Sequence, residues 1–78
     1  MDEFIQRVLR MFEQMKKDAL DLHELFEAGG NDPVERREVF YAVERLVEEG
    51  LLEERGQDFY ALTEEGKRAA RDLKSKES

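Results

Sequence analysis

The stretch VERLVEEGLLEERGQDFYALTEEGKRAA, residues 43–70, changes its hydrophobic period twice. Its first part has apolar residues at helical spacing up to Gly50, which can end a helix in a left-handed conformation. Two short apolar runs then flank a polar turn sequence around Gly56, a pattern typical of a β-hairpin. Thr63 can cap the helix that follows. The stretch therefore predicts a helix, a hairpin and a second helix.

The first of these helices has a clearly marked start in NDPVERREVFYAVERLVEEG, residues 31–50. Asp32 is a predicted N-cap, Pro33 suits the first helical position, and Glu35 completes a capping box. The apolar side chains share one side of the helix: Val39, Val43 and Leu46, with Phe40 and Val47 beside them. We therefore expect an amphipathic helix of about four turns that ends at Gly50.

A shorter helix is expected just before it, in LDLHELFEAGGND, residues 20–32. Asp21 and Glu24 have the spacing of a capping box, and a Gly-Gly pair marks the end. Two helices joined by a turn as short as GGND form a candidate helix-turn-helix. His23 lies in the first turn of the short helix without a partner for catalysis or metal binding, so we assign it no function.

The N-terminal segment DEFIQRVLRMFEQMKKDA, residues 2–19, predicts another helix, with Asp2 as its N-cap. Its apolar residues cover a broader arc than one core contact requires. One interpretation is a homodimer interface centred on Val8, Phe12 and Met15. The alternative is that a small domain packs against two sides of its longest helix.

The order helix, helix, turn, helix, hairpin, helix is that of a winged helix-turn-helix domain, a mainly α fold with a small β-hairpin wing. The sequence resembles this domain in MarR-like and PadR-like transcriptional regulators over about residues 19–72. The resemblance is carried by VERLVEEGLLEE, the end of a recognition helix and the next strand, and by FYALTEEGKRAA, the second wing strand and the next helix. We expect one domain over residues 1–74 and a frayed polar tail over residues 75–78.

Composition narrows the function classes. The chain has 78 residues, no cysteine and one histidine, which leaves no disulfide, no thiolate ligand and no histidine cluster for a metal. Without a phosphate-binding loop or a nucleophile–base pair, we expect no enzyme activity and no cofactor. No apolar run is long enough to span a bilayer, so we expect a cytoplasmic protein that does not bind membranes. The charged fraction of 42% resembles that of heat-adapted proteins.

The resemblance implies that the third helix enters the major groove of DNA and that the wing contacts the neighbouring backbone. The residues then expected to bind double-stranded DNA are Arg36, Arg37, Tyr41, Arg45 and Arg55. Glu35 and Glu38 on the same helix oppose this role, because carboxylates repel phosphates. The formal net charge of −7 opposes it further.

Two functions therefore remain open at the level of sequence. The first is a sequence-specific DNA-binding transcriptional regulator that reads DNA with the third helix and the wing. The second is an acidic winged-helix module that binds a basic protein partner, as a subunit or adaptor in transcription, without DNA.

Overall fold

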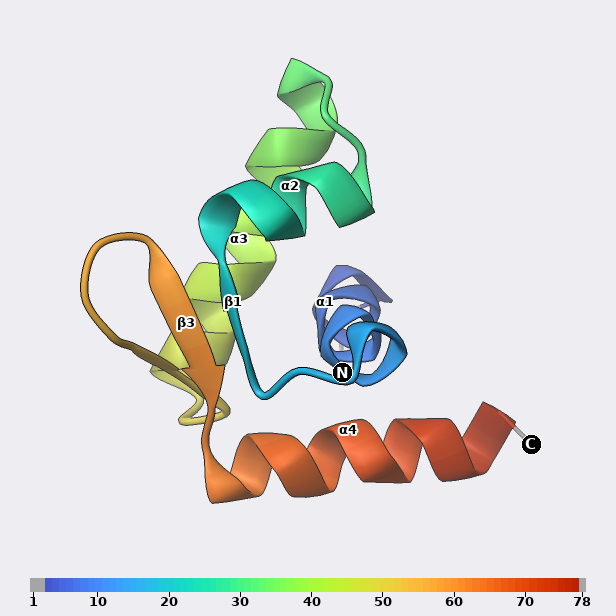
Figure 1. The fold of residues 1–78 in the computed structure, drawn as a ribbon. Coiled ribbons are helices and arrows are strands. Elements are labelled where there is room, and N and C mark those ends of the chain that lie inside the picture. The colour runs from blue at the N-terminus through green and yellow to red at the C-terminus, as the bar shows by residue number, and fades with distance from the viewer. Residues whose placement is uncertain (1–2, 78) are drawn as a thin grey trace.

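The computed structural model describes residues 3–77, with side chains described for residues 3–75. The chain is mainly helical and includes a small antiparallel sheet (Figure 1). The expected mainly α fold with a small β component is therefore confirmed. The elements are α1 (Glu3–Met15), β1 (Ala19–Asp21), α2 (Leu22–Gly29), α3 (Pro33–Glu48), β2 (Leu52–Glu54), β3 (Phe59–Leu62) and α4 (Glu64–Glu77).

The sheet has one strand more than the sequence predicted. The expected hairpin is formed by β2 and β3, but β3 also pairs on its other side with β1, so the strand order is β1-β3-β2. Leu20 lies opposite Tyr60 in this second pairing. The backbone nitrogen of Leu22 continues it with a hydrogen bond to the carbonyl oxygen of Asp58 at 2.7 Å. The segment between α1 and α2 is therefore held against the hairpin by backbone hydrogen bonds.

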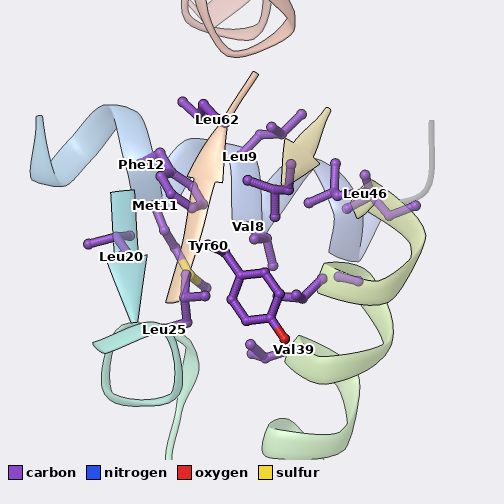
Figure 2. Close-up of a cluster of buried hydrophobic side chains, with 14 of the residues drawn as sticks. Val8, Leu9, Met11, Phe12, Leu20, Leu25, Val39, Leu46, Tyr60 and Leu62 are labelled. Carbon is purple, nitrogen blue, oxygen red and sulfur yellow. The ribbon is translucent and has the colours of Figure 1, made fainter. Parts of the chain in front are cut away.

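Helix α1 lies at the centre of the molecule, with α4 along one side and α2 and α3 along another (Figure 1). Its apolar face supplies Ile5, Val8, Leu9, Met11 and Phe12 to a single hydrophobic cluster that includes residues of every other helix and strand described. Figure 2 shows this cluster, in which the ring of Tyr60 extends from β3 towards α3. The broad apolar arc of α1 thus packs against its own chain on two sides.

This packing corrects the predicted dimer interface. Val8 and Phe12 are each 1% exposed and lie in the core, so neither side chain is accessible to a second subunit. They are covered because α3 and α4 both contact α1. Of the three predicted interface residues, Met15 alone is exposed, at 38%. Dimerisation itself stays a prediction.

The predicted helix caps are mostly confirmed. The Asp21 carboxylate accepts from the backbone N–H of Glu24 at 2.8 Å, and that of Asp32 accepts from Val34 and Glu35 at 2.9 and 3.1 Å. The N–H groups of Glu35 and Val34 hold the pKa of the Asp32 carboxyl below its ordinary value, although desolvation opposes them. The proposed cap Asp2 lies outside the described residues.

Helix α1 ends without the usual glycine. Lys16 takes the left-handed position with φ 54°, its N–H donates to Glu13, and the next N–H donates to Phe12, as in a Schellman motif. At the other end of the chain, the expected frayed tail is wrong for residues 75–77, which continue α4. None of the helices in the described range is long and apolar enough to cross a membrane.

Candidate interaction face of α3 and the hairpin

Helix α3 has one buried side and one exposed side. Val39, Ala42, Val43 and Leu46 are buried in the core, which fixes the orientation of the helix. The opposite side is exposed along its whole length, and it carries four of the five residues predicted to bind DNA: Arg36, Arg37, Tyr41 and Arg45. The fifth, Arg55, lies on the exposed β2–β3 connection. The structure therefore places all five on the surface, on α3 and the hairpin.

Most of these arginines already have partners within the chain. Arg36 donates from Nε and Nη2 to Asn31 Oδ1 at 2.9 and 2.7 Å, and its guanidinium lies 5.5 Å from the centre of the Phe26 ring. Arg45 pairs with Glu48 at 3.5 Å, and Arg55 pairs with Glu53 at 2.6 Å. Within the described range, the side chain of Arg37 has no ion pair or hydrogen bond. Arg37 is therefore the arginine best able to meet a new partner.

Carboxylates outnumber the cations on this part of the chain. Residues 32–58 hold four arginines and nine acidic residues, a formal net charge of −5. The acidic residues are Asp32, Glu35, Glu38, Glu44, Glu48, Glu49, Glu53, Glu54 and Asp58. This segment accounts for most of the net charge of −7. A phosphate backbone approaching α3 and the hairpin would meet a negative surface.

A groove of about 330 Å³ runs between α3 and the hairpin. Its lining combines apolar and acidic side chains: Phe40, Val43, Glu44, Val47 and Glu48 from α3, Glu54 from β2 and Tyr60 from β3. Phe40 and Val47 were expected beside the core face of the helix, but they are 42% and 38% exposed and leave apolar surface in the groove. We call this feature the α3–hairpin groove.

The Tyr60 phenol reports the negative potential of the α3–hairpin groove. Burial raises its pKa above the ordinary tyrosine value, and the charges of Glu54, Asp58 and Glu44 raise it further. Its hydroxyl also donates a long hydrogen bond to Glu54 Oε2, at 3.4 Å. Three carboxylates from α3 and the hairpin thus act on one hydroxyl. The electrostatic potential around the Tyr60 hydroxyl is therefore negative.

Sequence reasoning missed the groove residues Glu44 and Glu48, which it did not weigh as part of a site. The signal was present as a second stripe on α3, since residues 40, 43, 44, 47 and 48 follow the i, i+3, i+4, i+7, i+8 pattern of one helix face. The distance between this stripe and the hairpin could not be read from the sequence. His23, to which no function was assigned, is exposed and lies 3.0 Å from Glu27.

Positive side chains gather elsewhere, around a second groove of about 340 Å³ between α4 and the C-terminal end of α1. Its basic lining residues are Lys16, Lys17, Lys67, Arg71 and Lys74. Lys17 pairs with Glu24 at 3.1 Å, whereas the contacts of Lys67 with Asp18 and of Lys74 with Glu13 are longer, at 3.8 and 3.9 Å. An anion would therefore be attracted to α4 more strongly than to α3.

No metal site accompanies either groove in the part of the chain that the structure describes, where no three His, Asp or Glu side chains are grouped to hold an ion. Comparisons with protein-family models, with curated proteins and with solved structures gave no match to this chain.

Proposed function

We propose that the chain is a winged helix-turn-helix module. In support, α2 and α3 are joined by a short turn, the β2–β3 hairpin follows α3 directly, and a strand between α1 and α2 pairs with β3, the second strand of that hairpin. In this interpretation α3 is the recognition helix and the hairpin is the wing.

We further propose that the module acts by binding a protein partner through the face formed by α3 and the hairpin. The observation that carries this proposal is the α3–hairpin groove, where Glu44, Glu48 and Glu54 surround exposed apolar surface. A winged helix that binds DNA turns this face towards phosphates, and neutralising them requires an excess of cations, whereas here nine carboxylates outnumber four arginines. Exposed apolar surface beside charges of one sign suits a protein surface of the opposite sign.

DNA binding is the second candidate, because Arg36 and Arg37 are exposed on the N-terminal half of α3 and Tyr41 is exposed at its middle. In a winged helix this half reaches the base edges, where arginine reads guanine. The candidate meets two obstacles. Arg36 must leave Asn31 and Phe26 to reach DNA, and Glu35 and Glu38 lie on the same half of the helix.

A selection from a random duplex library, at low and at moderate salt, tests the choice between the two. We expect no sequence to be enriched at either salt concentration. Enrichment that disappears in the Arg36→Ala/Arg37→Ala variant would establish the regulator function and overturn the protein-binding proposal. Weak, sequence-independent retention that disappears in a Lys67→Ala/Arg71→Ala variant would reflect phosphate attraction to the basic groove instead.

A further inference from the structure

The apolar surface of α3 continues from the core into solvent. The buried stripe consists of Val39, Ala42, Val43 and Leu46, and Phe40 and Val47 extend it towards the hairpin. Phe40 and Val47 are two turns apart on the helix, a separation of about 10 Å along its axis. Exposed apolar side chains are common singly, but these two line one groove with Val43 and Tyr60. The groove therefore offers a contiguous apolar floor.

The edges of the groove are acidic on both sides. Glu44 and Glu48 lie one helical turn apart on α3, and Glu54 lies on β2 opposite them. No lysine or arginine contributes to the lining. Arg45 is exposed and pairs with Glu48 at 3.5 Å, but its side chain does not line the groove. Glu44 has no ion-pair partner in the described part of the chain.

We propose that the α3–hairpin groove binds a short segment of a partner protein in which one or two apolar side chains are flanked by lysine or arginine. The apolar side chains would contact Phe40 and Val47, and the flanking cations would meet Glu44, Glu48 and Glu54. The inference rests on the proposed function and adds the chemistry of the partner. A groove about 10 Å long accommodates about three residues of extended chain.

Charge complementarity selects this occupant over others. Duplex DNA and acidic segments are repelled by three carboxylates on the edges, and a purely apolar segment leaves those carboxylates desolvated without partners. The basic face of α4 on a second copy of this chain is the competing source of lysine and arginine. Self-association is therefore an outcome that the experiment must separate.

The experiment is a selection of random dodecapeptides displayed on phage against the immobilised chain. The enriched peptides are then measured against four variants by calorimetry. Phe40→Ser and Glu44→Lys alter the groove. Val34→Ser and Asp72→Lys make changes of the same kind, apolar to serine and acidic to lysine, at exposed positions that do not line it. Circular dichroism confirms that each variant is folded, and NMR shift changes locate the bound peptide.

We expect enriched peptides to place apolar residues beside lysine or arginine. Phe40→Ser and Glu44→Lys should each weaken binding by about tenfold or more, and the two control variants should leave it unchanged. No enrichment, enrichment of acidic peptides, or equal loss in the control variants would overturn the inference. Concentration-dependent self-association that Glu44→Lys abolishes would also overturn it, because the occupant would then be a second copy.

Failure of this inference can be told apart from failure of the proposed function. A native protein partner whose binding survives both Phe40→Ser and Glu44→Lys would contradict the groove chemistry and leave the protein-binding function standing. Sequence-specific duplex binding that requires Arg36 and Arg37 would contradict the function itself.

Discussion

The hydroxyl of Thr63 donates a hydrogen bond to the carbonyl oxygen of Gly50, with 2.6 Å between the two oxygens. The same Thr63 oxygen accepts a hydrogen bond from the backbone N–H of Gly66 at 3.0 Å, which caps α4. Gly50 has φ 78° and ends α3. One side chain therefore joins the end of α3 to the start of α4 across the intervening hairpin. This contact links the sequence EEGLL at the end of α3 to the sequence LTEEG at the start of α4.

Replacing Thr63 by Val should destabilise the domain by about 1 to 2 kcal/mol, because valine keeps the shape of threonine but neither caps α4 nor reaches Gly50. Thr63→Ser retains the hydroxyl and should cost clearly less. Urea unfolding of the three proteins measures the difference. A larger loss for Ser than for Val would mean that the methyl group, and not the hydroxyl, accounts for the stability.

Gly66→Ala should be strongly destabilising although Gly66 lies within a helix, where alanine normally improves stability. A Cβ atom at this position would overlap the carbonyl oxygen of Leu51, a backbone atom that cannot move aside freely. Gly56→Ala is the matched control, because nothing lies within 4 Å of its Cβ and only the positive φ of 72° opposes it. Thermal melting should therefore rank Gly66→Ala well below Gly56→Ala, and the reverse order would contradict this packing.

Leu46→Ala should cost about 2 to 5 kcal/mol, because the side chain is fully buried and its loss leaves a cavity in a domain with little stability to spare. Arg45→Ala changes the neighbouring exposed position and should stay within about half a kcal/mol. Denaturant titrations of both variants test the orientation of α3. Comparable losses would show that its core and solvent faces are wrongly assigned.

The raised pKa of Tyr60 predicts a loss of stability at alkaline pH. The folded chain holds the phenolic proton more tightly than the unfolded chain does. The contribution is therefore complete below the ordinary tyrosine pKa of 10.0 and is lost as pH rises through the higher folded value. A Tyr41→Phe variant isolates Tyr60 for titration by tyrosinate absorbance. Adding Glu54→Gln should lower the pKa of Tyr60 part of the way towards the ordinary tyrosine value. An unchanged titration curve would show that Glu54 does not raise this pKa.

The helix ends were the most predictable features, because a cap is a local interaction. Asp21, Asp32, Gly50 and Thr63 mark helix ends through interactions within a few residues of their own positions, and the structure confirms each of these roles. Strand β1 was not predictable in this way. Its three residues show no periodicity of their own, and they become a strand only through pairing with β3, some forty residues later in the chain.

The candidate site was predictable in its parts but not in its arrangement. Exposure of Arg36 and Tyr41 follows from the helical period, whereas the ion pairs of Arg45 and Arg55 depend on side-chain geometry. The distance between α3 and β2 creates the groove, and it is set by tertiary packing. The misplaced dimer interface has the same origin, since the two sides of α1 are covered by helices that are distant in sequence from one another.

Photo-crosslinking in the native host shows whether the face of α3 and the hairpin binds a protein or DNA. A benzophenone amino acid replaces Phe40, which is aromatic and exposed in the groove, and a control copy carries it at Arg68 on the exposed side of α4. We predict crosslinks from position 40 to one protein, which are absent from position 68, and no crosslinked DNA. Recovery of DNA crosslinked to position 40 would contradict the account.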